Sequence, residues 1–455
     1  LRVYLSTGTP GTTVIASANN IMTVSNQHWI LFRGIDFRYS NVNAVYLDGT
    51  RGITFDSCDL RWHGQDGYYF AGAGNIKDSI KNCDISWINS NGINAYTGSV
   101  ATDSIVITDN HFHSIGMFPG EGGVNEMRGI SFNTSGSTNI TIRYNIFDTT
   151  GWNAISMGSG TNLLIEKNRI LYPCYFLDDG GGIYLQDGGG GTNKTVVRNI
   201  VIHPGSAESI AGTDGASNQA YGIYFDAGHT NTLCRNNTVT GAGNGGIYMD
   251  DCQFITYDSN QLYNNVVGMT VEYNGNVHVN NLKIRRNVVA NQNGTSLPPY
   301  LMRMSRTVTD DVTLPNWGAI QNWCDSNVLV AGIGGIDYIQ GNLTGSGASY
   351  YTYFAWYSAT EAIQANRGLE QHSTSAPVEL TDTSQIILKY NESKSALPFS
   401  LSGMYKDGYG NSYNGTITLQ PFESRILFYQ GPIVTTTGLN IFLFGFNEPK
   451  KKRGF

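Results

Sequence analysis

A short motif recurs along most of the chain: an apolar residue, two variable residues, an asparagine, one more variable residue and a second apolar residue. It reads Ile-Thr-Asp-Asn-His-Phe at 107–112 and Ile-Arg-Tyr-Asn-Ile-Phe at 142–147. A period of two to four dozen residues predicts a solenoid, because one such unit is too small to bury its apolar face and must stack on its neighbours. The shortest steps, 23 residues, correspond to a bare coil, and longer steps of up to 38 residues carry loop insertions. The asparagine position is occupied in turn by Ile35, Cys58, Cys83, Asn110, Asn145, Asn168, Asn199, Asn237, Asn260, Asn287 and, on a looser match, Asn327.

A second pattern, small-apolar-variable-apolar, follows each copy of the first, as in Gly182-Ile-Tyr-Leu185 and Gly246-Ile-Tyr-Met249. Its period of two indicates strands with one buried face. We expect the asparagine to lie in an inward turn, to adopt the left-handed αL conformation and to hydrogen-bond its copy in the next coil. Leucine-rich and propeller arrays fit less well, since their signatures are missing. The sequence therefore predicts an all-β, right-handed parallel β-helix of about ten coils.

The repeat lapses after about residue 330, and short alternating strands with glycine-rich turns return from Ile386 to Tyr429. These strands predict a small β-sandwich-like domain, and the stretch 354–365 predicts a short connecting helix. We therefore expect a β-helix at 1–345, a C-terminal β domain with that helix at 346–432 and a tail at 433–455. The basic run Pro449 to Arg453 in the tail is expected to be a frayed end.

Composition limits the partners of the chain. Its net charge is −7 and only 14% of its residues are charged, which argues against nucleic acid and anionic membranes as partners. No apolar run is long enough to span a membrane. The six cysteines contain no CxxC pair and are expected to be buried free thiols. Because Leu1 is not a natural start, we expect that a targeting segment was removed.

The alternation of the strands places some side chains outside the coil. Tyr184, Tyr224 and Tyr248 should form an exposed outward column on three successive coils, whose strands lie roughly 4.8 Å apart. Tyrosine offers a flat apolar face and a hydroxyl, and carboxylates hydrogen-bond sugar hydroxyls. The pattern therefore predicts a surface that binds sugar rings. A second column beside it contains Gln186, Asp226, Asp250 and Glu272.

Carboxylates in this second column suit the cleavage of glycosidic bonds. Retaining glycosidases hold their two carboxyl groups about 5–5.5 Å apart and inverting ones about 6.5–9.5 Å apart. Adjacent coils fit the first spacing and coils two apart fit the second, so the stereochemical outcome stays open. Crowded acids raise at least one pKa, as a general acid requires. The alternatives are a solvated acidic surface or a site for a structural cation.

Further candidates lie near these columns. Asp178 and Asp179 precede a glycine run and the Tyr184 strand, and the alternative is a self-capped turn. His229 follows Asp226 by three residues and is a candidate acid, base or substrate contact, although a lone loop histidine often has neither role. Glu126 and Arg128 lie in a loop at 119–128 that could wall a groove, with the insertion 204–220 on the other side.

These features resemble a known group. The asparagine ladder, the Gly-Ile-Tyr strands, the run Asp178-Asp-Gly-Gly-Gly-Ile-Tyr184 and the closing segment Thr418–Leu427 are similar to bacterial right-handed parallel β-helix proteins of polysaccharide-degrading systems. Members with a small β domain after the helix, among them some fucan and xylan hydrolases, look closest. The resemblance implies a glycoside hydrolase or polysaccharide lyase, usually secreted, with catalytic Asp or Glu on the outward face. Met249-Asp-Asp-Cys252 echoes the polygalacturonase Asp-Asp motif, but no Gly-His-Gly follows it.

We therefore expect a secreted, periplasmic or cell-surface glycoside hydrolase that cleaves a plant or algal polysaccharide or oligosaccharide, with sulfated ones such as fucan included. Asp226 and Asp250 are the first catalytic candidates, followed by Glu272 and Asp179. No cofactor is required, a structural Ca²⁺ stays an open alternative, and the oligomeric state is left open. Two other functions remain: a lyase acting by β-elimination on a uronate-containing glycan, and a non-catalytic glycan-binding or tailspike-like protein. The expected substrate contacts are Tyr184, Tyr224, Tyr248, Gln186, Asp178, His229, Arg128 and Glu126.

Overall fold

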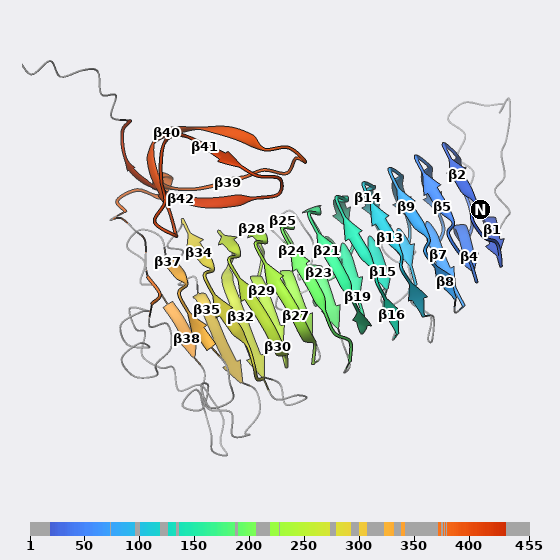
Figure 1. Cartoon of the computed structure of the whole chain (residues 1–455), viewed down its shortest axis with the longest axis horizontal. Coiled ribbons are helices and arrows are strands. Elements are labelled where there is room, and N and C mark those ends of the chain that lie inside the picture. Colours follow the sequence, from blue (N-terminus) through green and yellow to red (C-terminus); the bar gives the residue numbers. More distant parts are fainter. Residues whose placement is uncertain are drawn as a thin grey trace, which may run out of the picture.

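The computed structural model describes residues 19–433 apart from 73, 96–100, 119–125, 133–135, 187–189, 206–218, 227, 274–278, 293–299, 307–322, 332–337, 342–371, 375, 377 and 379. The described strands stack into a long parallel β-helix, and a small antiparallel sheet lies along one side of its C-terminal half (Figure 1). The predicted fold class is therefore confirmed. No helix among the described residues is long and apolar enough to cross a membrane.

Each coil contributes one strand to each of three parallel sheets, which we number 1 to 3. Sheet 1 has twelve strands: β1 (Asn20–Ser25), β4 (Asn43–Asp48), β7 (Tyr68–Ala71), β11 (Ile93–Asn94), β15 (Ile130–Phe132), β19 (Ile155–Met157), β23 (Gly180–Gln186), β26 (Ala220–Asp226), β29 (Gly245–Asp250), β32 (Val267–Tyr273), β35 (Tyr300–Arg306) and β38 (Tyr338–Gly341).

Sheet 2 has eleven strands: β2 (Leu31–Arg33), β5 (Thr54–Asp56), β9 (Ser79–Lys81), β13 (Val106–Thr108), β17 (Thr141–Arg143), β21 (Leu163–Glu166), β24 (Lys194–Val197), β27 (Thr230–Arg235), β30 (Gln253–Asp258), β33 (Lys283–Arg285) and β36 (Trp323–Asp325). Sheet 3 follows it in each coil, also with eleven strands: β3 (Asp36–Arg38), β6 (Asp59–His63), β10 (Asp84–Ile88), β14 (His111–Ile115), β18 (Ile146–Thr150), β22 (Arg169–Leu171), β25 (Ile200–Ile202), β28 (Thr238–Thr240), β31 (Gln261–Tyr263), β34 (Val288–Asn291) and β37 (Val328–Ala331). A short fourth sheet joins β8 (Asn75–Ile76), β12 (Thr102–Asp103), β16 (Ser137–Thr138) and β20 (Gly160–Thr161).

Apolar side chains from the three sheets fill the interior as one continuous core. Because the strands are in register, like residues stack on like: the rings of Phe112 and Phe147 lie 4.7 Å apart on successive coils. Burying each such side chain contributes about 1.5–3 kcal/mol. All six cysteines are free and buried, as predicted.

The asparagine position forms a ladder inside the turn between sheets 2 and 3. Oδ1 of Asn168 accepts hydrogen bonds from the backbone and side-chain nitrogens of Asn145 at 3.0 and 3.1 Å. The same contact joins each pair of successive asparagines from Asn110 to Asn327. At the start of the ladder, the backbone nitrogen of Cys83 donates to Oδ1 of Asn110. The predicted bonding between copies is therefore confirmed.

The αL conformation, however, belongs to the residue before each asparagine, so its expected position was wrong. Asp109 and Lys167, for example, have φ of 61° and 52°. The αL residue bends the chain from one sheet to the next, and this bend lets the following asparagine point inward. A non-glycine residue in αL is unusual, and the repeated ladder bonds compensate for its cost at each coil.

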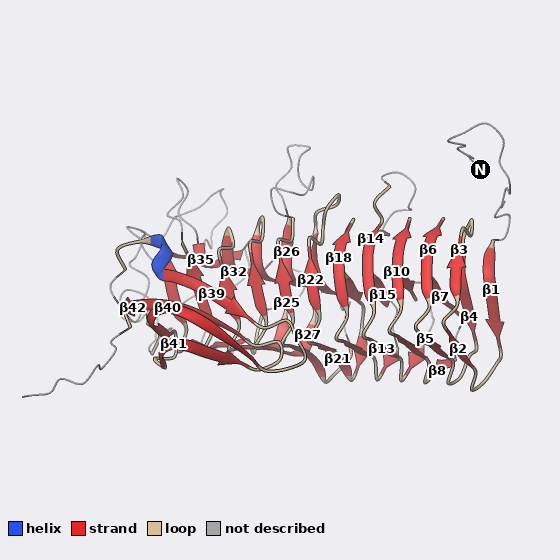
Figure 2. Cartoon of the chain, turned by 90° about the horizontal axis from the view of Figure 1, so that it is seen from above, coloured by secondary structure: helices blue, strands red, loops and turns tan. Residues whose placement is uncertain are grey.

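The C-terminal unit is one antiparallel sheet in the order β39-β42-β40-β41. Its elements are the 3₁₀ helix η2 (Thr383–Gln385), β39 (Ile386–Tyr390), β40 (Leu397–Asp407), β41 (Ser412–Leu419) and β42 (Ser424–Gly431). The sheet packs on sheet 3, where Tyr263 donates to the Ile386 carbonyl at 2.9 Å and Gln261 accepts from the Ile426 nitrogen at 3.0 Å. The predicted sandwich thus takes its second layer from the β-helix itself, which Figure 2 shows from above. The expected helix at 354–365 and the basic tail lie outside the described residues.

Candidate functional site

The outward face of sheet 1 carries both columns on β23, β26, β29 and β32. The register pairs Tyr184 with Tyr224 and Tyr224 with Tyr248. It also pairs Gln186 with Asp226, and Asp250 with Glu272. We call the first set the tyrosine column (Tyr184, Tyr224, Tyr248) and the second the acid column (Gln186, Asp226, Asp250, Glu272).

The tyrosine column is buried, which corrects the expectation of exposed sugar-binding rings. Tyr184, Tyr224 and Tyr248 are only 6%, 4% and 7% exposed and form a cluster with Tyr221. Tyr248 stacks on Tyr221 at 4.3 Å, and Tyr184 meets Tyr224 edge-on at 5.1 Å. Rings this close cover one another, because they can pack edge to face or offset in a column. Their faces are therefore not open to a sugar, although their hydroxyls remain at the edge of the cluster.

Each hydroxyl of the tyrosine column holds one carboxylate. Tyr184 donates to Oδ2 of Asp226 at 2.5 Å, and Tyr248 donates to Oε2 of Glu272 at 2.6 Å. A longer bond of 3.4 Å runs from Tyr224 to Oδ1 of Asp179. Burial, reinforced by the neighbouring negative charges, raises the pKa of each tyrosine, so the hydroxyls stay protonated donors.

The carboxylates occupy unequal surroundings. Asp179 is exposed, has φ of 51° and immediately precedes β23. Loss of hydration raises the pKa of Asp179, the charge of Asp226 raises it further, and the Tyr224 bond opposes the rise. Asp226, Glu272 and Asp178 are half-buried, whereas Asp250 is 9% exposed. A carboxyl group with a raised pKa, Asp179, therefore interacts electrostatically with a second carboxylate, Asp226.

Arg128 lies on the same face, on the N-terminal side of the tyrosine column, and is 2% exposed. Its guanidinium lies 4.4 Å from the centre of the Trp152 ring, and Nη1 donates to Oγ of Ser131 at 3.2 Å. The positive charge of Arg128 also opposes the rise that burial causes in the pKa of Tyr184. Glu126 is half-buried. Burial raises the pKa of Asp66, and the negative charge of Glu126 raises it further. Of the two predicted loop residues, Arg128 therefore lies beside the tyrosine column, whereas Glu126 interacts with Asp66.

Sequence reasoning missed a set of buried polar atoms on this face. Among the described residues they have no hydrogen-bond partner: Asn94 Oδ1, Trp152 Nε1, Asn153 Nδ2 and Ser156 Oγ. Ser156 pairs with Tyr184 in the register of sheet 1. Strand alignment alone could therefore have placed Ser156 one coil before the tyrosine column. Such atoms are costly unless water or a ligand satisfies them. Gly180 is needed here, because a Cβ would lie 2.4 Å from both Trp152 Nε1 and Asn153 Oδ1.

His229 does not belong to the site, which corrects its assignment as a substrate contact. It is fully buried, with Nε2 2.6 Å from Oγ1 of Thr232 and its ring centroid 5.1 Å from that of Phe225. Burial lowers the pKa of His229 well below its usual value. The His229 side chain therefore lies in the interior and not on the outward face of sheet 1.

Comparison with known proteins identifies the family. The model of the right handed beta helix region matches residues 19–207 and 128–298. The chain therefore belongs to the right-handed β-helix family, and its handedness is as predicted. No curated protein sequence matches it.

Several solved structures share the fold at low identity. A double mutant of the periplasmic alginate epimerase AlgG is 14% identical over 64% of this chain and 71% of its own, with a TM-score of 0.37. The Dettilon tailspike protein is 13% identical over 88% of this chain and 69% of its own, with a TM-score of 0.33. The catalytic domain of a GH87 α-1,3-glucanase is 13% identical over 63% of this chain and 58% of its own, with a TM-score of 0.25.

Proposed function

We propose that this protein is a secreted or periplasmic glycoside hydrolase that cleaves a polysaccharide on the outward face of sheet 1. The observation that carries the proposal is the pair Asp179 and Asp226. These carboxylates come from successive coils, interact electrostatically and are each held by a tyrosine hydroxyl. Two carboxyl groups in unequal environments are the arrangement that acid catalysis of glycoside cleavage needs.

Asp179 takes the role of general acid in this proposal. It is exposed, and loss of hydration together with the charge of Asp226 raises its pKa, which is the direction that a general acid requires. As the glycosidic C–O bond breaks, the Asp179 proton passes to the leaving oxygen. Asp226 either attacks the anomeric carbon or removes a proton from the water that attacks it.

The other members of the site would hold the sugar. Asp250 is nearly buried, so it ranks behind Asp179 as the partner of Asp226. Gln186 and Glu272 lie at either end of the acid column, where they can hydrogen-bond sugar hydroxyls.

The proposal is tested by incubating the full chain with plant and algal polysaccharides, sulfated ones included. Reducing ends and near-ultraviolet absorbance are followed together. We expect reducing ends without absorbance, and a loss of at least about 10²-fold in Asp179→Asn and in Asp226→Asn. The matched control is Asp48→Asn, which lies on sheet 1 at β4 and should keep full activity.

Other outcomes would overturn the proposal. Growing absorbance would mean an unsaturated product and a lyase. Glycan binding without cleavage, which survives the loss of Asp179 and Asp226, would mean a non-catalytic binding protein. If a polysaccharide is cleaved, NMR of the first product gives its anomeric configuration. Retention would make Asp226 the nucleophile, and inversion would make it the general base.

A further inference from the structure

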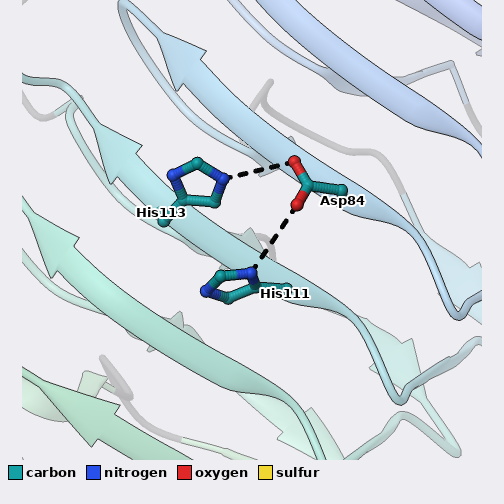
Figure 3. Close-up of side chains that lie close together, drawn as sticks. All are labelled: Asp84, His111 and His113. Atoms are coloured by element: carbon teal, nitrogen blue, oxygen red, sulfur yellow. Dashed lines mark hydrogen bonds and ion pairs between the residues drawn. The ribbon is translucent and has the colours of Figure 1, made fainter.

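A second cluster lies on the outward face of sheet 3, away from the acid column. Asp84 begins β10, and His111 and His113 lie on the next strand, β14. Asp84 and His111 are directly paired in the register. Figure 3 shows the Asp84 carboxylate facing both imidazole rings. The three side chains are held by neighbouring strands of the solenoid, so their arrangement is built into the fold.

The donor atoms have the spacing of metal ligands. Oδ2 of Asp84 lies 3.6 Å from Nδ1 of His111, and Oδ1 lies 3.2 Å from Nε2 of His113. One donor atom from each residue can be chosen so that all three lie within 4.8 Å of one another. A tetrahedral ion with bonds of about 2.0–2.1 Å places its ligand atoms about 3.3 Å apart. Small side-chain rotations would therefore bring the three donors around one ion.

We propose that Asp84, His111 and His113 bind a divalent transition-metal ion of the zinc class. Two imidazole nitrogens and one carboxylate oxygen suit Zn²⁺, Co²⁺, Ni²⁺ or Cu²⁺, whereas Ca²⁺ and Mg²⁺ prefer sites made of oxygen. The fourth position is left for water. The side chains of Asp84, His111 and His113 are 26%, 44% and 26% exposed, so an ion reaches them from solvent.

Arg61 competes for the same carboxylate. Its Nη2 lies 3.5 Å from Oδ1 of Asp84 and equally 3.5 Å from Oδ2 of Asp59. When the ion binds, the guanidinium can keep Asp59 as its partner. Removing the charge of Arg61 should therefore tighten metal binding, because the cation repels the ion and occupies its ligand.

The bound ion would join two coils through side chains rather than through backbone bonds. Asp84 belongs to one coil and both histidines to the next, so the ion cross-links them on the outside of sheet 3. A ligand that binds only the folded state stabilises it, so Zn²⁺ should raise the melting temperature by a few degrees.

The test is calorimetric titration of the chelator-treated full chain with ZnCl₂. We expect one saturable equivalent that is lost in His111→Asn/His113→Asn and kept in His203→Asn, a half-buried histidine that stacks on Tyr172. We also expect tighter binding in Arg61→Gln. Thermal melting without metal checks that each variant is folded, and Ca²⁺ in place of Zn²⁺ should give no binding at this site.

Two results would overturn the proposal. The first is zinc binding that is absent in the wild type or unchanged in the double histidine variant, as an ordinary Asp84–histidine ion pair would give. The second is a Co²⁺ complex with an intense near-ultraviolet thiolate band, which would assign binding to the buried cysteines. Weak visible bands without that thiolate band would support the site.

Discussion

The Tyr184 hydroxyl donates a 2.5 Å hydrogen bond to Oδ2 of Asp226 on the next coil. Because burial and the charge of Asp226 raise the pKa of Tyr184, this hydroxyl keeps its proton and stays a donor. The bond therefore orients the carboxylate that we propose as nucleophile or base. Tyr184 is a positioning residue, since it acts through Asp226.

Tyr184→Phe tests this relationship. We expect kcat to fall about 10²-fold with KM little changed, because a misplaced reacting group costs rate more than binding. Steady-state kinetics on the active polysaccharide measure both constants. Tyr46→Phe is the matched control: Tyr46 lies on sheet 1 at β4 and stacks on Tyr69 at 5.6 Å. An unchanged kcat in Tyr184→Phe would contradict a positioning role.

The buried asparagine ladder should contribute far more to the free energy of unfolding than an exposed row of hydrogen-bonded asparagines. Asn168 is fully buried and bonds both neighbouring rungs as well as the Ile142 carbonyl, so Asn168→Ala should cost about 2–4 kcal/mol of unfolding free energy. The exposed Asn162 makes similar side-chain bonds, to Asn139 and from Asn193. Asn162→Gly keeps its αL backbone and should change stability by less than about 0.5 kcal/mol. Denaturant titration compares the two, and equal losses would argue against the ladder.

His63 should make stability depend on pH. It is 1% exposed, Nδ1 accepts from the Ser40 nitrogen, and Nε2 donates to the Phe37 carbonyl. Burial lowers the pKa of His63 to about 4, so the neutral ring is favoured in the folded state. Its stabilisation is complete above the ordinary histidine pKa of about 6.5 and is lost as the pH falls toward 4.

The measurement is the difference in unfolding free energy between wild type and His63→Gln. Taking this difference removes the contributions of other titrating groups. We expect the wild-type advantage to shrink by roughly 3 kcal/mol between pH 7 and pH 4. A difference that is constant with pH would refute the assignment.

The interface between the C-terminal sheet and the β-helix should depend on Phe422. This side chain is 4% exposed and packs with Ile200 and Ile202, and its ring meets Tyr144 edge-on at 5.8 Å. Phe422→Ala should cost about 3–5 kcal/mol, through lost burial and the cavity left behind. Phe399→Ala is the control, since Phe399 is only partly buried and packs within the C-terminal sheet. Equal effects in denaturant unfolding would mean that the interface contributes little.

The fold was predictable because the same local signal recurs in every coil. The ladder positions from Cys83 to Asn327 lie where the spacing placed them. The αL residue was misassigned, since spacing alone does not distinguish which of two adjacent residues bends the chain. Asp109 bends it, and Asn110 uses the bend to point inward.

The candidate site was only partly predictable. A period of two is enough to align Asp226 with Gln186, and that alignment is present. The burial of Tyr248 depends on Tyr221, which lies outside the repeating pattern. His229 shows the same limit, because its burial is decided at a corner rather than along a strand.

By itself, the sequence determined the solenoid, its register and the two outward columns, because strand alternation and coil length are local properties that every repeat restates. Tertiary structure alone decided which outward residues are covered and which groups meet. The Asp84 carboxylate and the His113 ring come within 3.2 Å through the stacking of two coils. The Tyr184 hydroxyl reaches Asp226 in the same way. Such distances depend on how neighbouring coils pack, and burial is the sum of contacts from several of them.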